Sequence, residues 1–90
     1  MKLLTKEITI KNKSGLHSRP STLLVETAKR FSADIRLIQD QMSVDSKSIL
    51  DVMSLGCALG TRLTITARGK DAEEALEALA KLISNKFGEE

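Results

Sequence analysis

Apolar residues recur along this chain at two different spacings, and the way the spacings succeed one another restricts the fold. In residues 4–10, 33–38 and 61–68 every second residue is apolar, which predicts half-buried β-strands. In residues 20–31 and 72–87 apolar residues recur every third or fourth position, which predicts helices with one apolar face. Each element has one face to bury, so we expect them to pack together in layers.

Two shorter segments complete the predicted order of elements. Residues 42–44 follow a turn and form a hairpin with the strand before them. Residues 49–55 form a short apolar helix that begins after Ser48. Asp71 followed by Glu74 predicts a capping box at the start of the last helix. The order βαββαβα indicates an α+β two-layer sandwich, a single sheet covered on one side by helices.

The composition limits the core and the classes of partner. The 90 residues fit one domain over residues 1–90, and the only aromatic residues are Phe31 and Phe87, so the core must be aliphatic. The 14 basic and 12 acidic residues are spread along the chain. Because stacking aromatic residues are also missing, the sequence does not indicate nucleic-acid binding. We expect a monomer.

The sequence also predicts a cytoplasmic location. The N-terminus lacks an apolar stretch of signal-peptide length, and no apolar run is long enough for membrane insertion. The single cysteine, Cys57, cannot form an internal disulfide and lies in an apolar run, where a small buried residue is expected. These features fit a reducing compartment.

The only histidine, His17, lies in the sequence Gly-Leu-His-Ser-Arg-Pro at residues 15–20, between a predicted strand and a predicted helix. Gly15 can turn the chain at positive φ, and Pro20 fits the first turn of a helix. We expect the imidazole beside unpaired backbone N–H groups at the positive end of the helix, with Arg19 next to it. A phosphoryl group could be carried there. On these grounds alone, a solvated turn histidine beside a solvated arginine remains an alternative.

A second candidate site is the start of the short helix after Ser48. A serine hydroxyl there can cap the helix, and a phosphate on it would add about −1.5 to −2 charges at the end that favours anions. So short a helix cannot bury apolar residues on all of its sides. Some of these residues are therefore expected to form a patch where partner proteins dock, although each of them could instead belong to the core. Leu16 and Leu23 are not explained by the apolar stripe of residues 20–31 and are expected to be exposed beside His17. The candidate docking residues are therefore Leu16, Leu23, Ile49, Leu50 and Met53.

Residues 15–20 together with residues 47–56 (Lys-Ser-Ile-Leu-Asp-Val-Met-Ser-Leu-Gly) resemble HPr, the histidine phosphocarrier family of the bacterial phosphoenolpyruvate-dependent phosphotransferase system. The resemblance covers essentially the whole chain. It implies an open-faced two-layer sandwich with a four-stranded antiparallel sheet and three helices on one face. It also implies that Nδ1 of His17 takes a phosphoryl group from enzyme I and passes it to an enzyme IIA. Arg19 matches the active-site arginine, and Ser48 matches the serine that HPr kinase/phosphorylase modifies in many Gram-positive members.

The residue types agree with this chemistry. A neutral imidazole is a competent nucleophile, and a phosphorus–nitrogen bond that becomes labile on protonation suits a carrier that must release its cargo. Arg19 can neutralise the phosphoryl charge, and the backbone N–H groups of Ser18 and Arg19 can hold its oxygens. The sequence has no metal-binding motif or P-loop, so we expect no metal or cofactor beyond the covalent phosphoryl group.

Two features bear on the choice between transport and regulation. Asp51 lies one helical turn from Ser48, where many Gram-positive members have glycine, and its charge would repel a phosphate on that serine. Residues 31–34 and 85–90 look closer to the nitrogen-related, NPr-like branch, which is mostly regulatory. The alternative function is therefore an NPr-like or Crh-like regulatory binding protein that is not coupled to sugar uptake.

Overall fold

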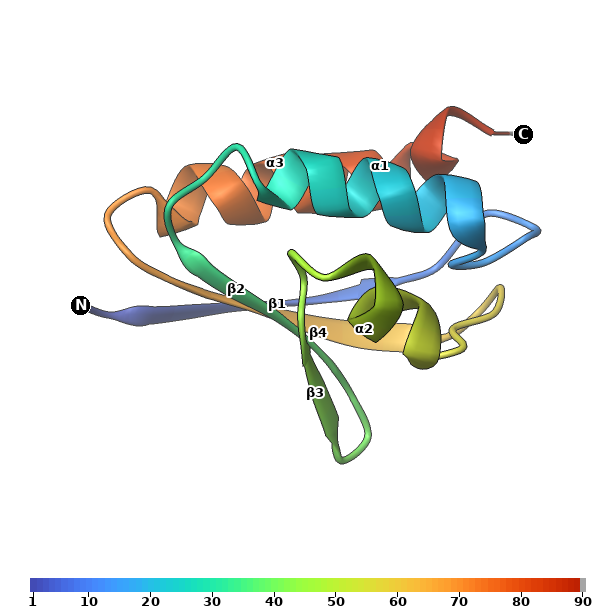
Figure 1. Ribbon diagram of the computed structural model, residues 1–90, viewed down its shortest axis with the longest axis horizontal. Coiled ribbons are helices and arrows are strands. Elements are labelled where there is room, and N and C mark those ends of the chain that lie inside the picture. Colours follow the sequence, from blue (N-terminus) through green and yellow to red (C-terminus); the bar gives the residue numbers. More distant parts are fainter. Residues whose placement is uncertain (90) are drawn as a thin grey trace.

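The structure, a computed structural model, describes residues 1–89, so residue 90 of the expected domain lies outside it. The elements follow the predicted order βαββαβα (Figure 1). The strands are β1 (Leu3–Thr9), β2 (Asp34–Gln39), β3 (Met42–Asp45) and β4 (Arg62–Arg68). The helices are α1 (Ser18–Ala28), α2 (Ile49–Ser54) and α3 (Ala72–Ser84), and a short 3-10 helix, η1 (Lys86–Gly88), follows α3.

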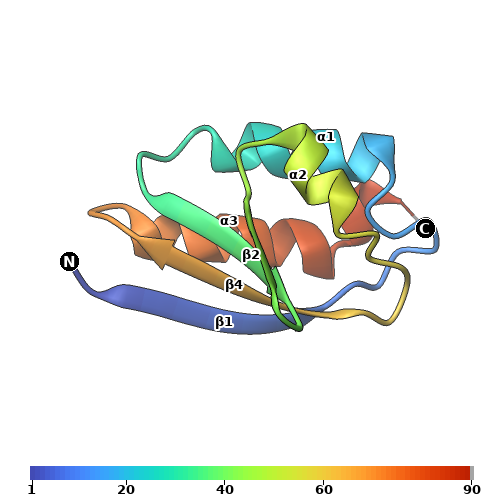
Figure 2. The same ribbon diagram turned by 60° about the horizontal axis from the view of Figure 1, so that its bottom comes forward.

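The four strands form one antiparallel sheet in the order β1-β4-β2-β3 (Figure 2). Strand β4 lies between β1 and β2, with Ile65 opposite Leu37. The alternate residues Leu63, Ile65 and Ala67 of β4 have no exposed surface, which confirms the apolar face predicted from the two-residue spacing.

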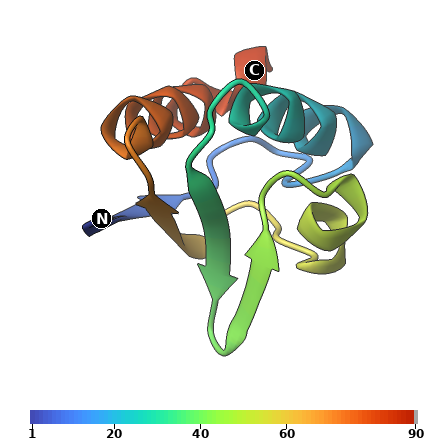
Figure 3. The ribbon, with the colours of Figure 1, turned by 60° about the vertical axis from the view of Figure 1, so that its left-hand side comes forward.

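Helices α1 and α3 cover one face of the sheet, and α2 lies beside α1 and β3 (Figure 1, Figure 3). Helix α1 buries Leu24, Val25 and Ala28, which lie on the apolar face predicted for residues 20–31. The predicted continuation of this helix to Phe31 is wrong, because the helix ends at Ala28 and Phe31 is only half-buried beyond it. The buried apolar side chains form one continuous, almost wholly aliphatic core. Among the residues that the structure describes, no helix has both the length and the apolar character needed to cross a membrane.

The last helix is shorter than predicted. Helix α3 ends at Ser84, and the following turn contains two consecutive left-handed residues, Lys86 (φ 57°) and Phe87 (φ 56°). This turn stops the helix and lets the side chain of Phe87 pack into the core. The predicted continuation of the helix to Phe87 is therefore wrong. Phe87 is nevertheless buried, as its place in the apolar pattern of residues 72–87 predicts.

The start of α3 is tied to the loop before β2. The predicted capping box is wrong, because Asp71 makes no side-chain cap hydrogen bond with α3. Its carboxylate instead accepts hydrogen bonds from the backbone N–H groups of Ser32 and Ala33, both at 2.8 Å. The hydrogen bond from Ser32 is the main cause that lowers the pKa of Asp71. This aspartate thus joins a loop to a helix that is distant in sequence.

Candidate active site

His17 is the residue immediately before α1, and its backbone is extended (φ −72°, ψ −174°). Its carbonyl oxygen accepts a hydrogen bond from the N–H of Ser21 at 2.9 Å, which starts the helix. The imidazole makes no capping hydrogen bond and is exposed. The helix therefore fixes the backbone of His17 and leaves the ring accessible.

The segment before His17 is packed against residues 57–61. The N–H of Leu16 donates to the carbonyl oxygen of Cys57 at 2.9 Å. Gly15 has φ +65°, and a Cβ at this position would lie 2.9 Å from Cα of Ala58 and closer still to the carbonyl oxygen of Cys57. Glycine is thus required both by the left-handed backbone and by the close approach of the two segments. The positive-φ turn predicted at this residue is confirmed.

A buried serine fixes the other side of the same segment. Ser21 has no exposed surface, and its hydroxyl donates to the carbonyl oxygen of Leu16 at 2.9 Å. This hydrogen bond and the one from Leu16 to Cys57 hold the residue immediately before His17 at both its N–H and its carbonyl. Sequence reasoning missed this positioning role, because a serine inside a helix carries no signal of its partner.

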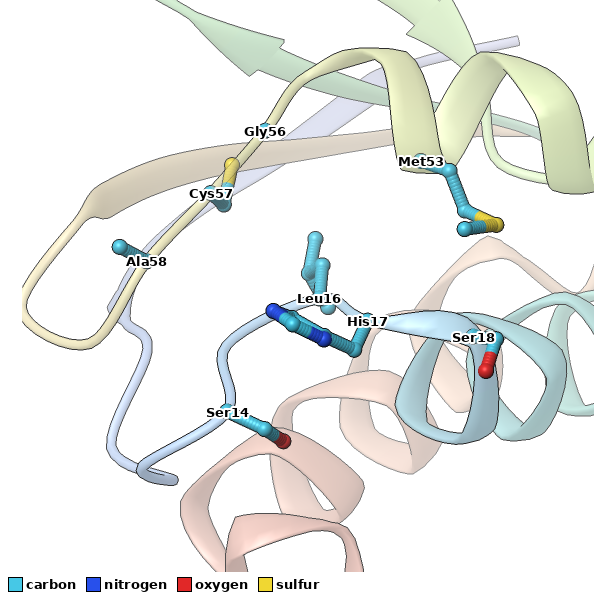
Figure 4. A pocket seen from close by; sticks show the side chains of 8 residues that line it. All are labelled: Ser14, Leu16, His17, Ser18, Met53, Gly56, Cys57 and Ala58. Atoms are coloured by element: carbon cyan, nitrogen blue, oxygen red, sulfur yellow. The ribbon is translucent and has the colours of Figure 1, made fainter.

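A cavity of about 390 Å³ opens beside His17 (Figure 4). The residues that line it are Ser14, Leu16, His17, Ser18, Met53, Gly56, Cys57 and Ala58. Figure 4 shows the imidazole between Ser14 and the segment that carries Cys57 and Ala58, with Met53 facing the cavity from α2. Within residues 1–89 no group of three His, Cys, Asp or Glu side chains is arranged to hold a metal ion.

The first turn of α1 supplies backbone donors next to the ring. The N–H groups of Ser18 and Arg19 precede the first helical hydrogen bond, and Pro20 has no N–H to offer. An anion beside His17 would therefore meet unpaired N–H groups at the positive end of α1. The side chain of Arg19 is exposed on this turn and is not part of the cavity wall.

The wall of the cavity contains a cysteine that sequence reasoning had placed in the core only. Cys57 is buried, and its thiol lies 3.5 Å from Oε1 of Gln39. Burial raises the pKa of this thiol to about 11. The thiol is thus protonated and a poor nucleophile at neutral pH, and it is buried, whereas the imidazole of His17 is exposed. Residues 56–58 were missed as site residues because only folding brings them to the cavity beside His17.

Ser48 caps α2, as predicted. Its hydroxyl accepts a hydrogen bond from the N–H of Asp51 at 3.3 Å. The Asp51 carboxylate lies in the same first helical turn, where Oδ2 is 3.4 Å from the N–H of Asp45. Ser48 does not line the cavity beside His17, but Met53 of the same helix does. Helix α2 therefore has Ser48 at its start and contributes Met53 to the cavity beside His17.

The candidate docking residues separate into two groups. Ile49, Leu50 and Met53 of α2 are 38%, 78% and 40% exposed. Leu16, in contrast, is only 4% exposed, so its expected exposure is wrong: its backbone is held on both sides, and its side chain joins the core. Leu23 is half-buried against the core and lines a separate cavity between α1 and α3, so it does not flank His17. The α2 residues alone remain candidates for docking.

Known proteins resemble this chain, in sequence and in fold, over almost its whole length. The family model "PTS HPr component phosphorylation site" matches residues 4–85. The phosphocarrier protein HPr of Treponema pallidum is 38% identical, over 98% of this chain and 100% of its own length. The HPr-like protein Crh of Bacillus subtilis is 40% identical, over 90% of this chain and 95% of its own. A crystal structure of HPr from Thermoanaerobacter tengcongensis is 50% identical, covers 100% of this chain and 99% of its own, and superposes with a TM-score of 0.91. Since the family model and these relatives cover almost the whole chain, in sequence and in fold, this chain belongs to the HPr family of phosphocarrier proteins of the phosphotransferase system.

Proposed function

We propose that this protein carries a phosphoryl group on Nδ1 of His17, accepts it from enzyme I and passes it to an enzyme IIA. The observation that supports the proposal most strongly is the position of His17, an exposed imidazole at the start of α1 beside an open cavity. An anion at such a helix end is stabilised by about 0.3 to 2 kcal/mol. The phosphoryl group is attached covalently, so the transfer needs no cofactor on this chain.

The surrounding residues can support both acceptance and release. A neutral ring nitrogen attacks phosphorus as the bond to the donor breaks, and the N–H groups of Ser18 and Arg19 hold the phosphoryl oxygens. The exposed guanidinium of Arg19 can turn toward the same oxygens and offset their charge. These contacts act on the transferring group without enclosing it, as a carrier between two partners requires.

Incubation with phosphoenolpyruvate and enzyme I is the test of this proposal. Intact-mass measurement should show one added phosphoryl group on the wild-type chain, and brief acid treatment should remove it. The His17→Ala variant should accept none. The matched control is Ser48→Ala, which changes the other candidate site and should accept phosphate as the wild type does. Acid-labile phosphate on the His17→Ala protein would refute the assignment.

Ser48 is proposed as a second phosphorylation site, modified by an ATP-dependent kinase of the HPr kinase/phosphorylase class. Its half-buried hydroxyl caps α2, and a phosphate there would change the charge beside the exposed side chains of Ile49 and Leu50. The modification would thus alter how partners bind to α2.

The carboxylate of Asp51 should oppose this modification, because it lies in the same helical turn as Ser48. We expect Asp51→Asn to increase the equilibrium phosphorylation of Ser48 roughly twofold, which corresponds to the energy of a like-charge pair on a helix. Intact-mass measurement with kinase and ATP tests this, with Ser48→Ala as the unmodified control. An Asp51→Asn protein that gains no phosphate over wild type would remove the proposed repulsion.

The likeness to Crh favours a second candidate function, a regulatory binding protein of the NPr-like or Crh-like kind that is not coupled to sugar uptake. Phosphate transfer through His17 distinguishes the two functions. A chain that binds partners through α2 but accepts little phosphate from enzyme I would be regulatory. The exposed histidine in an open cavity favours the carrier.

A further inference from the structure

The C-terminal end of the chain reaches the loop that precedes His17. Oε1 of Glu89 accepts a hydrogen bond from Nδ2 of Asn12 at 3.1 Å and another from the hydroxyl of Ser14 at 3.0 Å. Figure 1 shows the C-terminus at the same end of the molecule as the loop before α1. A glutamate from the far end of the sequence therefore takes part in the structure of this loop.

Asn12 continues the connection toward the active site. It has no exposed surface, and its Nδ2 also donates to the carbonyl oxygen of Gly15 at 2.8 Å and to Oγ of Ser14 at 3.2 Å. Ser14 in turn lines the cavity beside His17 (Figure 4). The Glu89 carboxylate is thus linked through one side chain to the backbone two residues before the imidazole, and directly to the cavity wall.

The backbone of the C-terminal turn explains how Glu89 arrives there. Lys86 and Phe87 are both left-handed, a conformation that non-glycine residues rarely adopt in succession. The buried side chain of Phe87 holds this turn against the core. A conformation of this kind persists only where the surrounding structure enforces it, so the placement of Glu89 is built into the fold.

The geometry points to Glu89 as a positioning residue for phosphoryl transfer. Its carboxylate orders residues 12–15 through Asn12 and Ser14, and this loop sets where the imidazole of His17 lies. Among the described residues the salt bridge joins Arg62 to Glu7, and Glu89 is not part of it. Glu89 therefore acts through the hydrogen bonds that its carboxylate accepts. This role rests on the proposed function of His17 and adds to it a residue that does not touch the phosphoryl group.

Rates of phosphorylation by enzyme I test this role with matched variants. Glu89→Ala removes the acceptor and should slow phosphorylation of His17 roughly three- to tenfold, less than the ~100-fold cost of outright misplacement of a reacting group. Glu89→Gln keeps an acceptor oxygen at the same position and should restore most of the rate. The control is Glu77→Ala, an exposed glutamate of α3 outside this network, which should react as the wild type does. The loss should fall on kcat and leave KM for enzyme I nearly unchanged, because the exposed α2 side chains are untouched.

Phosphorylation of the wild-type protein shows which of the two proposals fails, the carrier function of His17 or the positioning role of Glu89. If wild type accepts no phosphate, the function proposed for His17 fails; if wild type and Glu89→Ala react at the same rate, only the positioning role is overturned. Equal slowing in Glu89→Ala and Glu89→Gln also overturns it. Circular dichroism shows whether each variant is folded at the assay temperature. Should Glu89→Ala be unfolded, Ser14→Ala removes one of the two donors to Glu89, and an unchanged rate in that variant would refute the role.

Discussion

Gly15 and Gly56 have nearly the same backbone conformation, with φ of +65° and +62°, but different surroundings. A Cβ at Gly15 would meet the backbone of Cys57 and Ala58, whereas one at Gly56 would meet nothing within 4 Å. We expect Gly56→Ala to lower the free energy of unfolding by about 1–2 kcal/mol, the cost of a left-handed alanine. Gly15→Ala should lower it by clearly more, because the two segments must also separate.

Urea unfolding of the two variants provides the measurement, and the difference between them isolates the close contact from the shared cost of positive φ. The same Gly15→Ala variant should be phosphorylated by enzyme I more slowly than the wild type, since the loop before His17 would be displaced. Equal losses of stability in the two variants would mean that the loop can move away from residues 57–58 without loss of free energy. Gly15 would then be needed only for its left-handed backbone conformation.

The positions of His17 and Ser48 at the starts of helices could be predicted from sequence, because the local signals of a helix start are strong. His17 and Ser48 both precede helices, and turn and cap chemistry acts over a few residues. The environment of Leu16 could not be predicted in this way, because its burial depends on the contact with Cys57. The hydrogen bonds of Glu89 are equally invisible, since no periodicity in residues 85–90 indicates a partner near residue 12.

The types of the helices and strands followed from apolar spacing, whereas their ends depended on tertiary contacts. The alternation in β4 predicted its buried face, because every second side chain of a strand points the same way. The end of α3 differed because Phe87 reaches the core through a left-handed turn instead of a further helical turn. The start of α3 differed because the Asp71 carboxylate binds a neighbouring loop.

The link between α3 and the loop before β2 should depend on pH. The hydrogen bond from the N–H of Ser32 lowers the pKa of Asp71 below its value in the unfolded chain. The charged carboxylate therefore favours the folded state: its contribution is complete above the unfolded pKa, about 3.9, and is lost as the pH falls through the folded pKa. We expect Asp71→Asn to be less stable than wild type at neutral pH, with a difference that shrinks below about pH 4.

Urea midpoints at neutral pH and near pH 3 measure this difference. Asp34→Asn, a substitution of an exposed aspartate on β2, serves as the control for a general change in charge. A difference between Asp71→Asn and wild type that is the same at both pH values would contradict the proposed linkage.

Segments from distant parts of the sequence meet at one end of the molecule, and the order of strands brings them there. Because β1 pairs with β4, the end of one strand lies beside the start of the other. Ile10 and the 60–61 segment exchange hydrogen bonds of 2.8 and 2.9 Å just beyond that pair. The loop before His17 thus runs beside residues 57–61, with the C-terminal turn at the same end (Figure 1). The fold class was predictable from the sequence, but this convergence required the pairing of the strands.

A carrier must release its phosphoryl group as well as accept it, and this requirement provides the decisive test. The protein phosphorylated at His17 is purified away from enzyme I and phosphoenolpyruvate and mixed with enzyme IIA, and the intact masses of both proteins are followed over time. We expect the mass of one phosphoryl group to leave this chain and appear on enzyme IIA. Phosphoprotein that keeps its phosphate under conditions in which a known HPr transfers it completely would contradict the carrier function.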